Sequence, residues 1–250
     1  MFEFHEKYKD PVTGRNRKHV YLYDGKPMTG VTTILSVLAK PALIQWAANK
    51  AVDFLVERGT PYYGPGDDLK DHYIVNGEQL ELARKAHVRI KDEAAEKGKD
   101  VHAEVEEYAK KAISDTDGHA FEANPGYSPL AQKFIEWAVS NEVIFLASEK
   151  KMHDPELFIA GTADILLEMN GKKYIADLKT SNGIYPEMFY QVAAYRLLLE
   201  KMGEPTDGSL IIRIDKKTGE LETAERYDYT TDRDAFLAAL IIHRANATYA

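Results

Sequence analysis

The chain has 250 residues, of which 44% are hydrophobic and 29% charged, with a net charge of −8. These values are typical of an ordinary globular protein, and they argue against a protein that coats nucleic acid through a broad basic surface. The absence of cysteine excludes disulfides, cysteine-ligated zinc and cysteine-ligated iron–sulfur clusters, and it fits a reducing cytoplasm. The longest apolar run, AFLAALII, is too short for a membrane helix of ~20 residues, and MFEFHEKYKD lacks the apolar stretch of a signal peptide.

The N-terminal third is expected to be mostly helical. In chain order, its sequence predicts a β-hairpin leading into a helix start (18–35), a helix (41–58), a Gly-, Pro- and Tyr-rich loop (59–77) and a long charged helical region (78–113). The hairpin turns at Asp24-Gly25, and the helix over 41–58 has Pro41 in its first turn and Gly59 after its last. A break in the long helix is expected near Gly98.

The remaining chain alternates strands and helices. It predicts a helix (128–141), three strands (142–152, 157–169 and 172–180), a helix (186–203), a hairpin (209–229) and a final helix from about residue 232. This order is typical of an α+β or α/β core with a mixed sheet. We therefore expect residues 1–95 to form a hairpin and helical cap and residues 96–250 to form the core, together as one compact unit.

Asn170-Gly171 separates the second and third of these strands. It is the strongest short hairpin signal, because a type I′ turn needs positive φ at both central positions. With these two residues at the turn, Met169 faces Lys172, and the pairing continues outward one residue at a time on each strand. One face of the hairpin then pairs only core-like residues: Leu167 with Tyr174, Ile165 with Ala176, and Ala163 with Leu178.

Charged residues lie on the other face of this predicted hairpin. Asp177 and Lys179 share that face, and read alone they would fit a solvated strand edge with a weak salt bridge. The register, however, sets Asp164 across from Asp177 and Thr162 across from Lys179, and directly opposed like charges are destabilising. A divalent cation would account for the opposed aspartates, since Mg²⁺ and Mn²⁺ prefer carboxylates, waters and phosphate oxygens. Lys179 could then orient water or stabilise charge at a reacting phosphate.

The segments GTAD (161–164) and DLK (177–179) resemble the PD-(D/E)XK nuclease superfamily, which carries a metal-binding Asp and an Asp/Glu-x-Lys on adjacent strands. Three flanking segments are similar to its RecB-like branch: KGKDVHAEVEEY (97–108), SEKKM (148–152) and YQVAAY (190–195). YDGKPMTGVTTIL (23–35) more loosely resembles phage-encoded and mitochondrial genome-maintenance exonucleases. The resemblance implies a restriction-endonuclease-like core, in which helices flank a mixed central sheet.

The resemblance also implies roles for individual residues. Asp164 and Asp177 would bind Mg²⁺ or Mn²⁺, with His102 in the metal shell and Glu149 as a further acidic group. Gln191 would hold the catalytic Lys179 and the backbone in place, and Tyr195 would lie near the substrate path. Without the resemblance, the sequence leaves simpler alternatives open. His102 could be a surface or core histidine, and Glu149 could lie at an exposed strand end. Gln191 and Tyr195 could belong to an amphipathic packing stripe on one helix face.

Several expectations about activity follow from the resemblance. We expect an exonuclease acting from free ends of single-stranded DNA, in the cytoplasm of a bacterial or phage-infected cell. The chain lacks the four cysteines that hold an iron–sulfur cluster in many relatives, and it lacks a Walker A motif for ATP, so any unwinding would need a separate helicase or recombinase. The alternatives are a structure-specific or nicking endonuclease, a non-catalytic DNA-binding accessory of recombination or replication, and an α+β protein with no role on nucleic acid.

Aromatic and basic residues are interleaved over residues 41–95. They are Trp46, Tyr62, Tyr63 and Tyr73 with Lys50, Arg58, Lys70, Arg84, Lys85 and Arg89. Aromatic rings stack on unpaired bases and basic side chains follow phosphates, so this region could guide a single strand toward the metal. The alternative is a helical cap whose aromatic residues are simply core.

Overall fold

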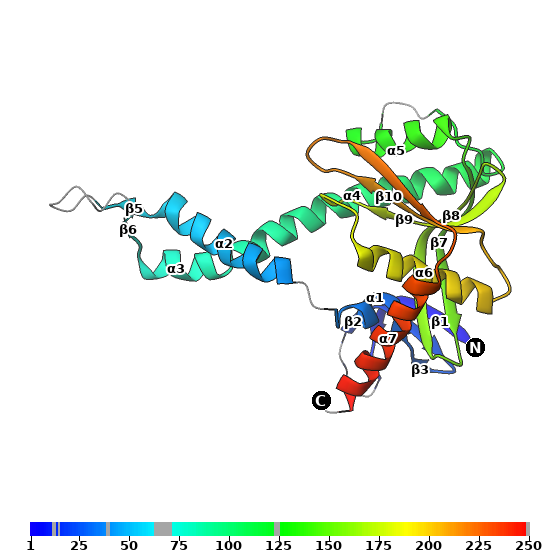
Figure 1. The fold of residues 1–250 in the computed structure, drawn as a ribbon, viewed down its shortest axis with the longest axis horizontal. Helices are drawn as coiled ribbons and strands as arrows, with labels where there is room; N and C mark the ends of the chain where they lie inside the picture. Colours follow the sequence, from blue (N-terminus) through cyan, green and yellow to red (C-terminus); the bar gives the residue numbers. More distant parts are fainter. Residues whose placement is uncertain (12–13, 15, 39–40, 63–71, 123–125, 249–250) are drawn as a thin grey trace. The chain divides into compact units, whose positions relative to one another are not determined.

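The computed structural model describes residues 1–11, 14, 16–38, 41–62, 72–122 and 126–248 (Figure 1). The chain forms two units, one of Met1–Leu38 with Val101–Ala250 and one of Ala39–Asp100. This division differs from the expected one at residues 95 and 96, because the first 38 residues belong to the larger unit. Strand β4 (Thr29–Gly30) accounts for part of this difference, since it pairs with β8 (Ile159–Met169).

A mixed six-stranded sheet forms the centre of the larger unit. Its order is β11-β10-β9-β8-β4, and β7 also pairs with β8. The other strands are β7 (Ile144–Asp154), β9 (Lys172–Lys179), β10 (Gly208–Ile214) and β11 (Leu221–Arg226). Strand β9 runs antiparallel to β8 and parallel to β10, so the predicted mixed sheet is confirmed.

Helices cover both faces of this sheet (Figure 1). Residues of α4 (Ala86–Asp115) from Val101 onward and α5 (Pro129–Ser140) pack on one face. Helices α1 (Val31–Leu35), α6 (Pro186–Lys201) and α7 (Thr230–Ala247) pack on the other. Apolar residues of the strands are buried in both layers, which confirms an α+β fold with a central sheet flanked by helices.

The β8/β9 hairpin follows the predicted register over half its length. Asn170 and Gly171 have φ values of 53° and 68°, and the strands pair from Met169 with Lys172 to Ile165 with Ala176. The ladder ends there, so the predicted pairs of Asp164 with Asp177, Ala163 with Leu178, and Thr162 with Lys179 do not form.

The two strands diverge at Asp164 for a local reason. The Asp164 carboxylate Oδ2 accepts a hydrogen bond of 2.9 Å from the Leu178 backbone N–H, a donor that the predicted ladder would have used. Strand β8 continues beside β4 through Ile159 and Ala160, whereas β9 continues beside β10. A side chain thus takes the place of backbone pairing between these strands.

A small antiparallel sheet precedes α1 in the larger unit. It consists of β1 (Phe2–Lys9), β2 (Asn16–Tyr23) and β3 (Lys26–Pro27). The turn at Asp24-Gly25 is confirmed, with φ values of 48° and 73°. The Phe2 ring stacks on the imidazole of His153 in β7, with 4.1 Å between ring centroids, and so attaches this sheet to the central one.

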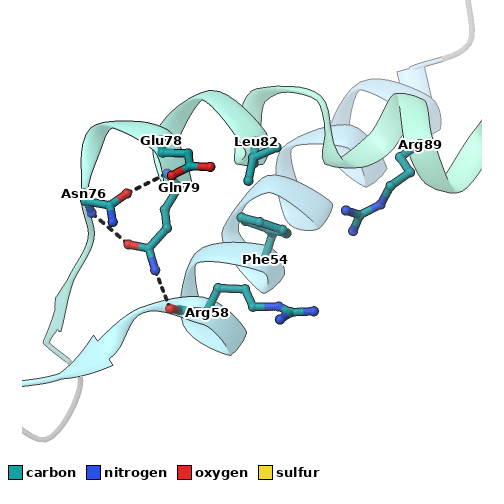
Figure 2. A pocket seen from close by; sticks show the side chains of 7 residues that line it. All are labelled: Phe54, Arg58, Asn76, Glu78, Gln79, Leu82 and Arg89. Atoms are coloured by element: carbon teal, nitrogen blue, oxygen red, sulfur yellow. Dashed lines mark hydrogen bonds between the residues drawn. The ribbon is translucent and has the colours of Figure 1, made fainter.

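The smaller unit contains α2 (Pro41–Arg58), β5 (Thr60–Pro61), β6 (Tyr73–Ile74) and α3 (Gly77–Arg84). Asn76 and Gln79 form a capping box at the start of α3, and Gln79 Nε2 also donates to the Arg58 carbonyl at 2.6 Å (Figure 2). The long charged helix breaks at Lys85 rather than near Gly98, which lies within α4. Within the described residues, no helix is long and apolar enough to cross a membrane.

Candidate active site

Three polar side chains, joined by two hydrogen bonds and one ion pair, form a closed ring where β8 and β9 diverge. Gln191 Nε2, from α6, donates to Asp177 Oδ1 at 3.0 Å, and Lys179 Nζ donates to Gln191 Oε1 at 3.2 Å. Lys179 also forms an ion pair with Asp177 Oδ2. Asp177 is only 1% exposed, so its charge is held by these two partners away from bulk water.

The amine of Lys179 keeps its positive charge in this setting. Burial opposes that charge, but the carboxylates of Asp177 and Asp164 outweigh it and raise the pKa of the Lys179 ammonium. The sequence predicted Lys179 and Asp177 side by side on one strand, and Gln191, which the resemblance implied would hold Lys179, forms hydrogen bonds with both.

Tyr195 extends this network toward β8. Its hydroxyl accepts a 2.9 Å hydrogen bond from Gln191 Nε2, and burial together with the charge of Asp177 raises the pKa of the phenol well above its usual value. Gly161 leaves room for the Tyr195 ring, because a Cβ there would lie 2.6 Å from Cε1 of the ring. The glycine of the GTAD segment is therefore required by close packing against Tyr195.

Asp164 and His102 both form hydrogen bonds with the backbone of Leu178. The Leu178 N–H donates to Asp164, as described, and His102 Nε2 lies 2.8 Å from the Leu178 carbonyl oxygen, to which it donates. His102 Nε2 is also 3.8 Å from Asp164 Oδ2. Burial and the negative charge of Asp177 raise the pKa of Asp164 to about 7.

Glu149 lies between Ser148 and Lys150, which pair with Ile165 and Ala163 on either side of Asp164. Its φ of 52° is in the left-handed region, which few residues other than glycine adopt. Burial, followed by the negative charge of Glu106, raises the pKa of Glu149. The predicted acidic residue on the preceding strand thus lies next to Asp164.

A small cavity lies between α4 and the sheet on this side. It is lined by His102, Val105, Glu106, Glu149, Asp164, Ile165 and Leu178. Glu106 was missed from the sequence, although it follows His102 by four residues and therefore shares its helix face. Asp177 and Lys179 do not line the cavity; they lie in the adjacent network, which the Leu178 peptide joins to Asp164.

The chemistry of these donors fits a hard divalent cation, although no finished cation site is formed. Within the part of the chain that the structure describes, no three His, Asp or Glu side chains are arranged to hold a metal ion. Burial, followed by the charge of a neighbouring carboxylate, nevertheless raises the pKa of both Asp164 and Glu149. Carboxylates in such a place suit Mg²⁺ or Mn²⁺, and ligation through His102 Nε2 would replace its hydrogen bond to Leu178.

A second pocket, of about 540 Å³, lies within the smaller unit (Figure 2). It is lined by Phe54, Arg58, Asn76, Glu78, Gln79, Leu82 and Arg89. The guanidinium of Arg89 lies 5.7 Å from the centroid of the Phe54 ring, which is buried in this unit's core. Two of the basic residues proposed to follow phosphates thus line one pocket.

The other aromatic and basic residues of residues 41–95 are dispersed. Tyr62 and Tyr73 are exposed, Trp46 is half-buried, and Tyr63 and Lys70 lie outside the described residues. Lys50 and Arg84 form ion pairs along their own helices with Asp53 and Glu81, respectively, and Lys85 is exposed between α3 and α4. The exposed tyrosines do not fit an aromatic core.

Comparisons with known proteins give little further information. No protein-family model and no curated protein matches the chain. One solved structure, described as "Crystal structure of SSO0001", is similar over 56% of this chain and 74% of that chain, with 13% sequence identity and a TM-score of 0.28.

Proposed function

We propose that the protein is a nuclease that depends on Mg²⁺ or Mn²⁺ and hydrolyses phosphodiester bonds in DNA through a restriction-endonuclease-like core of the RecB-like type. One observation carries the proposal: Asp164 and Asp177 approach each other where two strands diverge, and Lys179 is fixed beside them by Gln191. A solvated strand edge would not need a half-buried amide to hold this pair.

The residues divide into two roles. Asp164, Asp177 and Glu149, with His102 beside them, would hold the cation, which when bound activates water and neutralises charge on the phosphate. Lys179 presents a permanent positive charge that can orient water or stabilise the developing negative charge. Gln191 positions Lys179, and Tyr195 supports Gln191 through its hydroxyl.

We assign the activity to free ends of single-stranded DNA in the cytoplasm of a bacterial or phage-infected cell. The resemblance of 97–108, 161–164, 177–179 and 190–195 to RecB-like nucleases supports this assignment. Any duplex would have to be opened by a separate helicase or recombinase, since the chain carries no Walker A motif.

End-labelled linear and closed circular single-stranded DNA test the proposal directly. Each is incubated with the protein in Mg²⁺, Mn²⁺ or EDTA, together with Asp177→Asn, Lys179→Ala and the control Lys150→Ala, whose ammonium is paired with Glu204 instead. We expect loss of linear DNA only, abolished by EDTA and in the first two variants. Cutting of the circle would replace the exonuclease by an endonuclease, and no cleavage of either DNA by folded protein would contradict nuclease activity.

A further inference from the structure

A strip of aromatic rings with one lysine lies on the N-terminal sheet and β7 of the larger unit. Phe4 in β1 contacts Tyr21 and His19 in β2, with ring centroids 5.3 Å and 6.0 Å apart, respectively. Lys151 in β7 places its ammonium 4.6 Å from the centroid of the Phe4 ring. Phe4, Tyr21 and Lys151 are half-buried and His19 is exposed, so the strip is partly open to solvent.

The ammonium of Lys151 lies over the Phe4 ring and donates to the backbone carbonyl oxygen of Glu149 at 3.4 Å. Within the described residues, no carboxylate lies within ion-pair distance of this ammonium, although its positive charge opposes the rise in the pKa of Glu149. The preceding residue, Lys150, differs in this respect, because its ammonium contacts the Glu204 carboxylate at 2.7 Å. These adjacent lysines thus have different surroundings, and the Lys151 ammonium, which forms no ion pair with a carboxylate within the described residues, can bind a further anion.

The strip lies beside the acidic side chains of the candidate active site. The Tyr21 hydroxyl lies 2.9 Å from Thr162 Oγ1, and Thr162 pairs with Lys151 across β7 and β8. Thr162 precedes Asp164 by two residues, and Lys151 follows Glu149 by two. Two residues are the period of side chains along a strand, so Thr162 and Lys151 each lie one such period from a proposed metal ligand. A nucleic acid strand reaching Asp164 from this side would pass over these residues.

We propose that this strip binds a nucleotide of single-stranded DNA next to the bond that is cut. Lys151 binds a backbone phosphate, and Phe4 and His19 offer ring surfaces on which an unpaired base stacks. A single strand fits better than a duplex, because bases in a duplex already stack on one another. The position of this nucleotide rests on the proposed function, but its binding can be measured without cleavage.

Fluorescence anisotropy with a labelled oligothymidylate in EDTA tests the proposal. Lys151→Met should weaken binding about tenfold and reduce the slope of log K against log salt by about 0.7, the loss of one phosphate contact on a single strand. Phe4→Leu should weaken binding about fivefold without changing that slope, because stacking does not depend on charge. Lys150→Met is the matched control and should bind as wild type does.

Lys151→Arg tests whether weaker DNA binding by Lys151→Met has a purely structural cause. It keeps the cation over Phe4 and should restore both the affinity and the salt slope, while thermal unfolding confirms that each variant is folded. Equal affinity in folded Lys151→Met and Lys150→Met would overturn the inference and leave the Lys151–Phe4 contact as attachment of the hairpin.

The outcomes also separate this inference from the proposed function. Cleavage by wild type with no effect of Lys151→Met on binding would contradict the strip alone. Binding that depends on Lys151, without any metal-dependent cleavage, would contradict the nuclease alone. Absence of both binding and cleavage would contradict both.

Discussion

Gln191 uses both ends of its amide group. Its nitrogen donates to Asp177 and Tyr195, and its oxygen accepts from Lys179, so one side chain sets the positions of three others. The sequence predicted this role only through the resemblance of YQVAAY to RecB-like nucleases. Spacing alone places Gln191 and Tyr195 on one helix face, which a packing stripe would explain equally well.

Gln191→Leu should therefore separate positioning from folding. We expect cleavage to slow about 100-fold, because the lysine and carboxylate lose their common anchor. Loss of a hydrogen bond to the buried Asp177 should also lower the free energy of unfolding by about 1–3 kcal/mol. Single-turnover cleavage and urea unfolding measure the two effects. Gln132→Leu, on α5 and outside the network, serves as the control, and a wild-type cleavage rate in Gln191→Leu would contradict this role.

Gly161 tests the fit between β8 and α6. Gly161→Ala places a methyl group against the buried Tyr195 ring, which is 3% exposed and cannot move freely. We expect a loss of about 1–3 kcal/mol in the free energy of unfolding and slower cleavage, since Tyr195 supports Gln191. Urea unfolding checks the first effect. Gly126→Ala, where a Cβ meets no atom within 4 Å, should be close to neutral; equal stability of the two variants would contradict the packing argument.

The strands show what the sequence could and could not predict at the scale of elements. The Asn170-Gly171 turn and alternating side chains were enough to predict the register as far as Ile165 with Ala176. They could not predict that the Asp164 carboxylate would replace the next backbone bond, because strand pairing rules contain no side-chain acceptors. The two-residue β4 was also too short to leave a pattern.

The helical region between residues 78 and 113 shows a similar limit. Gly98 was the residue of lowest helix propensity, yet α4 continues through it, whereas the break lies at Lys85, where α3 ends. Glu106 could have been predicted from the helix face that it shares with His102, since the two residues are four apart and line the same cavity.

Attachment of the N-terminal sheet should depend on pH through His153. Burial lowers the pKa of this histidine from 6.5, opposed in part by the charge of Asp154 and reinforced by the N-terminal amine. A lowered pKa favours the neutral ring, so the stability it contributes is present above pH 6.5 and is lost as the pH falls through the lowered value.

Urea unfolding across this pH range measures the effect. His153→Phe keeps a ring stacked on Phe2 but cannot take up a proton, so its free energy of unfolding should fall less than that of wild type as the solution is acidified. Parallel curves for the two proteins would show that His153 does not control this attachment.

At the scale of the whole molecule, the net charge limits how the proposed site can bind nucleic acid. A net charge of −8 repels nucleic acid at long range, so any binding has to be local and supported by cations. The sequence was sufficient to predict the α+β class and most helices and strands, because their periodicity and turn residues are strong. It was insufficient for the unit boundaries, since the association of residues 1–38 with the core depends on tertiary contacts such as β4 with β8.

Binding of Mn²⁺ tests the central claim most directly. Isothermal titration with Mn²⁺ is carried out on wild type, Asp164→Asn, Asp177→Asn and Lys179→Ala, at a pH above 7 where Asp164 is ionised. The comparison distinguishes the aspartates, as metal ligands, from Lys179, whose role is in catalysis. We predict that binding is lost or weakened at least tenfold in both aspartate variants, because each removes a carboxylate ligand. Lys179→Ala should still bind Mn²⁺ while failing to cleave DNA. Equal Mn²⁺ binding in all four proteins would contradict a metal centre at Asp164 and Asp177.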